Sequence, residues 1–204
     1  MKVRRFVLLA VFGLGIASSV PMKTMWAHGN ETGVKHMVED MTVDRTASIP
    51  NPPPGKIAMR LSVTYVQDPL PGEGIQYFET SPEADGLWAM ESLPKGEALP
   101  VGKSIKDQVI FLSPSEAKGV TIAYRNPTRK EVKFTFLPHR EIPGARAPDT
   151  WLTCLCMAFV YKAPPEGTWY RVVKLKVGPD IPVGSKIDVV WPVLTDPAVL
   201  PEGD

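Results

Sequence analysis

The chain has 204 residues, which suits one domain with tails and argues against a second full domain. Its 23 Lys and Arg residues nearly balance its 22 Asp and Glu residues, and the sequence contains no long cluster of basic residues. We therefore expect no nucleic-acid partner. The 22 prolines and 16 glycines are scattered between apolar runs, a distribution typical of turns in an all-β protein.

Residues 1–27 predict a signal peptide or a membrane anchor. Basic residues within 2–5 precede the apolar run Phe6–Ile16, and small residues follow at 17–19. The sequence permits cleavage after Ser19 or after Ala27, and an uncleaved run would serve as a short anchor. We therefore expect a periplasmic or other extracytoplasmic protein, either secreted or membrane-anchored.

The rest of the chain divides into a tail, a domain and a second tail. Residues 28–55 predict a flexible polar tail closed by a stiff Pro-rich linker, Pro50–Gly55. Residues 56–197 predict a β-sandwich domain, and residues 198–204 a C-terminal tail. Within the domain, runs of β-branched and aromatic residues predict strands at 57–66, 75–79, 104–112, 120–125, 131–137, 150–161, 168–177 and 186–193.

Alternation is clearest at 132–136 and 173–177, where every second residue is apolar. About eight half-buried strands with short turns favour an immunoglobulin-like β-sandwich, with an open barrel as the competing architecture. The segments 68–74 and 86–102 are expected to be loops that gather binding residues. Trp169 and Tyr170 are neighbours on one strand, so we expect at least one of them to be exposed or at an interface.

Cys154 and Cys156 are the two cysteines of the chain, and they lie in the predicted strand 150–161. Residues i and i+2 of a strand share a face with their Cα atoms about 6.5–7 Å apart, which disfavours a disulfide between them. An oxidising compartment also disfavours idle thiols. Because thiolates select soft ions such as Cu(I), the pair is a candidate copper site. The alternative interpretation is that both cysteines are small core residues.

Three histidines are further candidate metal ligands. His139 follows a predicted strand on the connection to the cysteine segment, so it is a candidate third ligand, with a solvated loop histidine as the alternative. His28 and His36 lie in the polar tail. Cleavage after Ala27 would make His28 the mature N-terminus, whose amine and imidazole suit Cu(II) in a histidine brace.

The C-terminal half of the chain resembles the periplasmic domain of CtaG-type copper chaperones of cytochrome c oxidase assembly. The resemblance lies in a strand at 120–125 that ends in an Asn-containing turn, in Cys154-Leu155-Cys156, and in a Pro-Glu-Gly turn at 165–167 before a final strand pair. Leu155 and Met157 stand where that family has phenylalanine. The resemblance implies a membrane-anchored immunoglobulin-like domain that binds Cu(I) through the Cys-x-Cys thiolates, often as a homodimer, and delivers it to an oxidase subunit.

The sequence lacks the Gly-x-Ser-x-Gly, His-Glu-x-x-His, P-loop and dinucleotide-binding motifs. We therefore expect a binding protein that is not an enzyme, with copper as cofactor and a metalloenzyme subunit as its client. One alternative is an accessory subunit of an extracytoplasmic complex that presents Trp88, Trp151 and Tyr170 to a partner. The histidine-brace copper protein is the second alternative.

Overall fold

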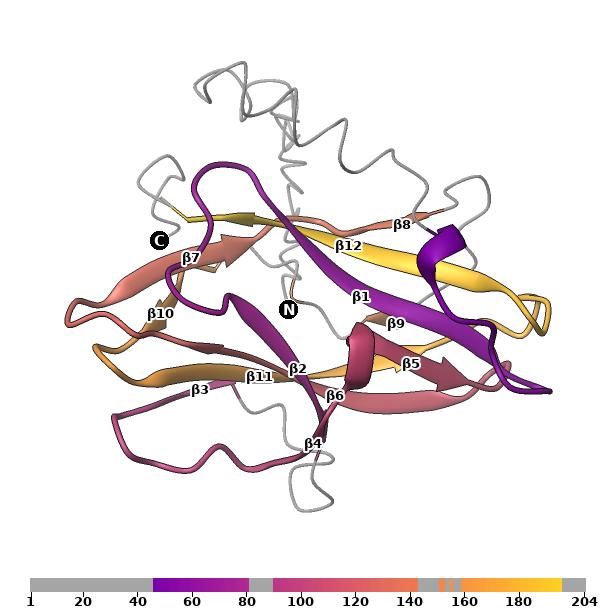
Figure 1. Cartoon of the computed structure of the whole chain (residues 1–204), viewed down its shortest axis with the longest axis horizontal. Coiled ribbons are helices and arrows are strands. Elements are labelled where there is room, and N and C mark those ends of the chain that lie inside the picture. Colours follow the sequence, from indigo (N-terminus) through magenta and orange to yellow (C-terminus); the bar gives the residue numbers. More distant parts are fainter. Residues whose placement is uncertain (1–45, 81–89, 143–150, 153–154, 156–158, 196–204) are drawn as a thin grey trace, which may run out of the picture.

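The computed structural model describes residues 46–80, 90–142, 151–152, 155 and 159–195, and this part of the chain is all-β. Two six-stranded sheets pack face to face as a β-sandwich (Figure 1). The prediction of an all-β protein is confirmed. The calls on residues 1–27, on most of the tail 28–55 and on residues 198–204 lie outside the described residues.

We name each sheet after its first strand in the chain. The β1 sheet has the order β10 (Tyr161–Ala163), β7 (Val132–Phe136), β12 (Lys186–Leu194), β1 (Ile57–Tyr65) and β5 (Val109–Leu112), and β8 (Arg140–Ile142) also pairs with β12. The β2 sheet has the order β3 (Met90–Leu93), β11 (Thr168–Lys176), β6 (Ala117–Arg125), β2 (Ile75–Thr80) and β4 (Val101–Ser104), and β9 (Trp151–Leu152) also pairs with β11. Two 3₁₀ turns, η2 (Thr46–Ser48) and η3 (Lys106–Gln108), complete the described elements.

The first and last strands of the domain lie side by side. β1 pairs with β12 in parallel over the register Ala58–Lys186 to Tyr65–Val193, whereas the other described pairs are antiparallel. No residue of either strand is exposed: eight of the nine residues of β12 and six of the nine residues of β1 are buried, and the others are partly buried. They therefore form the centre of the β1 sheet, as Figure 1 shows.

The core lies between the sheets and follows the alternation in the sequence. Phe134 and Phe136 of β7 point into it, as predicted, and Trp169 of β11 meets them from the facing sheet with ring centroids 5.0 and 5.8 Å away. Tyr161 joins the same cluster, 4.8 Å from Trp169. The Phe134–Trp169 pair is edge-to-face, an arrangement that contributes about 0.5–1.5 kcal/mol beyond the area that the two rings bury.

Two strands lie in the segment 86–102, which the sequence predicts to be a loop: β3, and the first residues of β4. Both end the β2 sheet. An edge strand has one hydrogen-bonded neighbour and a more exposed surface, so Met-Glu-Ser-Leu and Val-Gly-Lys-Ser need not show the alternation that identifies a half-buried strand. The loop prediction is wrong for these residues.

The predicted strand 104–112 is interrupted. β4 ends at Ser104 in the β2 sheet, η3 follows, and β5 begins at Val109 in the β1 sheet. Asp107 and Gln108 have positive φ values of 52° and 58°, which turn the chain from one sheet to the other. A periodic sequence pattern does not reveal a crossing between sheets, because both halves remain extended.

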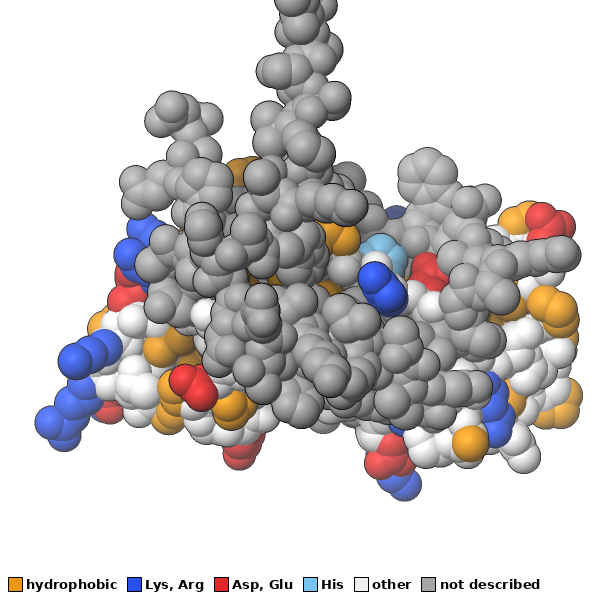
Figure 2. Space-filling view, turned by 90° about the horizontal axis from the view of Figure 1, so that it is seen from above, with side chains coloured by type: hydrophobic (Ala, Val, Ile, Leu, Met, Phe, Trp, Pro, Cys, Tyr) orange, Lys and Arg blue, Asp and Glu red, His pale blue; other side chains and the backbone are white. Residues whose placement is uncertain are grey.

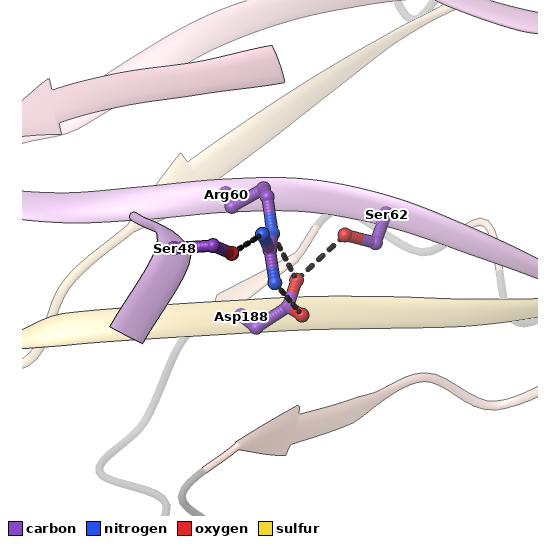
Figure 3. Close-up of polar contacts among 4 residues, drawn as sticks. All are labelled: Ser48, Arg60, Ser62 and Asp188. Carbon is purple, nitrogen blue, oxygen red and sulfur yellow. Dashed lines mark hydrogen bonds and ion pairs between the residues drawn. The ribbon is translucent and has the colours of Figure 1, made fainter. Parts of the chain in front are cut away.

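A buried ion pair joins the two central strands (Figure 3). The Arg60 guanidinium of β1 donates to both carboxylate oxygens of Asp188 on β12, at 3.2 and 2.6 Å, and Asp188 is fully buried. Ser62 donates to the same carboxylate at 2.6 Å, and Arg60 also donates to Ser48 of η2 at 2.5 Å. This polar group ties the segment before β1 to the sheet, where Ile49 is buried as well.

Asn126 connects the turn after β6 to the turn before β11. Its buried side-chain amide donates to the carbonyls of Lys130, Ala163 and Pro164 at 2.8, 3.2 and 2.9 Å. Its side-chain oxygen accepts from the amide and the hydroxyl of Thr128, at 2.9 and 2.8 Å. The Asn-containing turn singled out in the sequence therefore holds together the two loops at one end of the sandwich.

A third polar contact fixes the turn between β5 and β6. The Ser113 amide donates to the Glu116 carboxylate at 2.7 Å, and the Lys56 ammonium donates to it at 3.0 Å. The Ser113 hydrogen bond, followed by that from Lys56, lowers the pKa of the Glu116 carboxyl below its usual 4.5. This contact links the start of β1 to the turn.

Candidate metal site at the edge of the sandwich

The cysteine segment crosses from one sheet to the other. β9 pairs with β11 in the β2 sheet, and β10 pairs with β7 in the β1 sheet. Between them Leu155 lies in a bend, and Phe159 and Val160 are outside any strand. The predicted continuous strand 150–161 is therefore wrong. Packed sheets lie about 10 Å apart, so a chain passing between them must leave one ladder before it enters the next.

Leu155 is the described residue between the two cysteines, and it is fixed in the core. Its side chain is 1% exposed and belongs to the core cluster. Tyr161 donates its hydroxyl hydrogen to the Leu155 carbonyl at 3.1 Å, and Arg171 donates to the Tyr161 hydroxyl at 2.9 Å. Thr135 donates to the Phe159 carbonyl at 2.7 Å, which fixes the other end of the segment.

The structure describes one of the five candidate metal ligands. Cys154 and Cys156, together with His28 and His36, lie outside the described residues. Among the described residues, no three His, Cys, Asp or Glu side chains lie close enough to hold a metal ion.

His139 lies between β7 and β8, partly buried. Its side chain is 23% exposed, its ring centroid is 6.0 Å from that of Trp191, and its Nε2 is 3.8 Å from Oε1 of Glu141. The sequence analysis did not single out Glu141. Glu141 could have been identified from its position two residues after His139, because residues i and i+2 of an extended segment point to the same face.

The described surface shows where other ligands or partners could bind. Tyr170 is 4% exposed and Trp169 is 1% exposed, so the expectation that one of them lies at the surface is wrong. Both sit on β11, which has strand neighbours on each side. The exposed large apolar residues among those described are Phe159, Val160 and Val183.

An open groove of about 470 Å³ lies beside β2 and η3. Its polar lining comes from Glu73, Gln76, Ser104, Asp107 and Gln108. Glu73 belongs to the segment 68–74, and its carboxylate accepts a hydrogen bond from Gln76 within the groove.

Charges of both signs lie on one face of the sandwich. Seen from above in Figure 2, Lys and Arg side chains lie among Asp and Glu around the described rim of that face. In the part of the chain that the structure describes, no helix is long and apolar enough to cross a membrane.

The two sheets and the segment that crosses between them define an all-β sandwich protein. A family model for a domain of unknown function, DUF8709, matches residues 59–195, which is more than half of the chain. The chain therefore belongs to this family. The match begins inside β1 and ends just after β12, so it covers the described sandwich. No curated protein and no solved structure matches the sequence.

Proposed function

We propose that this protein is an exported, non-enzymatic copper carrier that binds Cu(I) through Cys154 and Cys156 and passes it to a membrane or periplasmic metalloenzyme. The observation that carries the proposal is the anchoring of Leu155, the residue between the two cysteines. It is buried in the core, and its carbonyl accepts a hydrogen bond from Tyr161. A thiol pair that flanks a fixed residue would lose little conformational freedom on binding an ion.

The fold in this proposal is an immunoglobulin-like sandwich behind a signal peptide or membrane anchor. Two sheets around one core, and a first strand that pairs with the last, support the immunoglobulin-like type. The basic and apolar residues within 1–27 support export.

Transfer would proceed by thiolate exchange. An incoming ligand displaces Cys154 or Cys156 from copper, and the second thiolate leaves when the client's next ligand binds. Such exchange requires a site with few ligands, because a saturated ion offers no position to the incoming group. Before transfer, two protomers could bind one ion together, and their two thiol pairs would then supply all of its ligands. Phe159 and Val160, exposed just beyond the segment, offer apolar surface for such a contact.

A competition titration tests the proposal. The purified protein is reduced and titrated with Cu(I) against a chromogenic chelator, and the Cys154→Ser/Cys156→Ser variant is measured in parallel. We expect the wild type to withdraw Cu(I) from the chelator and the variant to leave it bound. If both proteins behave alike, copper binding by the thiol pair is refuted.

Two other functions remain as alternatives. An accessory subunit would use the exposed Phe159 and Val160 at an interface, whereas Tyr170 is too buried to contribute. A histidine-brace protein requires His28 at the mature N-terminus, and the mass of the processed chain tests that requirement directly. Any other start removes the bidentate amine–imidazole ligand.

A further inference from the structure

Glu141 points toward the inside of the sandwich. In the antiparallel pair of β8 and β12, Glu141 lies directly across from Val189, so the two side chains share a face. Val189 and Trp191 both belong to the core cluster, which identifies that face as the inner one. A carboxylate has therefore been placed at the inner edge of the β1 sheet, where an apolar residue would be expected.

This carboxylate lacks a partner for one of its oxygens. The Glu141 side chain is 8% exposed, and its buried Oε2 has no hydrogen-bond partner among the described residues. A buried polar atom without a partner costs about 1–3 kcal/mol, and a charged one costs more. A bound cation would remove this cost, because it neutralises the carboxylate and accepts an oxygen lone pair.

His139 supplies a second donor atom beside it. The 3.8 Å between His139 Nε2 and Glu141 Oε1 exceeds hydrogen-bond length. Nitrogen and oxygen ligands of one tetrahedral Zn²⁺ ion lie about 3.4 Å apart, given metal–ligand distances of about 2.0–2.2 Å. A small rotation of either side chain closes the difference. The partial exposure of His139 leaves a route from solvent to the pair.

We propose that His139 and Glu141 form a binding site for Zn²⁺, in which water fills the remaining coordination positions. An imidazole nitrogen with a carboxylate oxygen suits this borderline ion, whereas Cu(I) prefers thiolates. The site goes beyond the proposed copper carrier, since it uses other donor atoms and a different ion. It does not require either cysteine.

The test uses the full chain with Cys154→Ser/Cys156→Ser as background, so that thiolates contribute nothing. Zn²⁺ is titrated into this background protein in competition with a zinc-sensitive dye. The same titration is made with three variants of the background protein, which carry Glu141→Gln, His139→Gln or Glu131→Gln. Glu131 is exposed just before β7, so its variant is the matched control for the loss of one carboxylate. We expect Glu141→Gln and His139→Gln each to weaken Zn²⁺ binding at least tenfold, and Glu131→Gln to leave it unchanged.

Thermal unfolding gives a second readout. Zn²⁺ should raise the midpoint of the background protein and of Glu131→Gln, and it should not raise that of Glu141→Gln or His139→Gln. His139 is partly exposed, so its variant still tests the site if Glu141→Gln fails to fold. Absence of Zn²⁺ binding by the background protein, or unchanged binding by both site variants, would overturn the zinc site. Either result leaves the Cu(I) titration of the wild type unaffected, so the two proposals fail separately.

Discussion

Replacing Asn126 with alanine should destabilise the protein more than any other single truncation of a loop residue described above. The side-chain amide supplies two hydrogens to neighbouring carbonyls, and its oxygen accepts one from the Thr128 amide and one from the Thr128 hydroxyl. At about 1 kcal/mol for each hydrogen bond, Asn126→Ala removes about 4 kcal/mol from the free energy of unfolding. A domain of this size has about 5–15 kcal/mol, so the variant should still fold.

Urea unfolding followed by tryptophan fluorescence measures this loss. Trp169 lies in the aromatic cluster of the core, so its emission reports on the packing of the two sheets. Asn51→Ala is the control, because Asn51 is exposed, and its cost should stay below about 0.5 kcal/mol. A loss of less than about 1.5 kcal/mol for Asn126→Ala would show that the two turns hold together without the amide, and would refute the reasoning.

Three further predictions concern side chains elsewhere in the sandwich. Arg60→Met leaves the buried Asp188 carboxylate without its ion pair and should lower the free energy of unfolding in urea by about 3–5 kcal/mol. Lys95→Met, at an exposed ion pair, is the control and should lower it by at most about 1 kcal/mol. Equal losses in the two variants would contradict this prediction. Tyr77→Phe removes a buried hydroxyl that has no hydrogen-bond partner in the part of the chain that the structure describes, so the midpoint of thermal unfolding should stay unchanged or rise. A clear fall in that midpoint would reveal a partner. The pKa of Glu116 is lowered on folding, so its stabilisation is present above about pH 4.5 and is lost as the pH falls through the folded pKa. In an acid titration followed by fluorescence, the stability of Glu116→Gln should therefore fall less steeply below pH 4.5 than that of the wild type. Parallel curves for the two proteins would refute the stabilising role of the Glu116 carboxylate.

The sequence predicts the parts of the fold in which one face of a strand is buried and the other is solvated. The alternation at 132–136 predicts that Phe134 and Phe136 lie in the core, and they do. β1 and β12 are different, because every residue of both strands is buried or partly buried and neither strand has a solvated face. Arg60 and Asp188 are 128 positions apart, so nothing local in the sequence indicates that these two charges neutralise each other.

Crossings between sheets are the features that the sequence pattern missed. The run 104–112 and the run 150–161 were each predicted as one strand, yet each contains the point at which the chain changes sheets. The chain is exposed at these crossings, at Lys106–Gln108 in one run and at Phe159 and Val160 in the other, although apolar residues flank each crossing. The candidate site was predictable in part: His139 was identified as a candidate ligand, whereas Glu141 required the register of β8 on β12 to show that it points inward.

X-ray absorption at the copper edge of Cu(I)-loaded protein tests the central claim most directly, because it identifies the atoms bound to the ion. The account predicts a first shell dominated by sulfur in the wild type, and loss of that shell together with the copper in Cys154→Ser/Cys156→Ser. A wild-type first shell of nitrogen and oxygen alone would contradict it, and so would a sulfur shell that survives replacement of both cysteines.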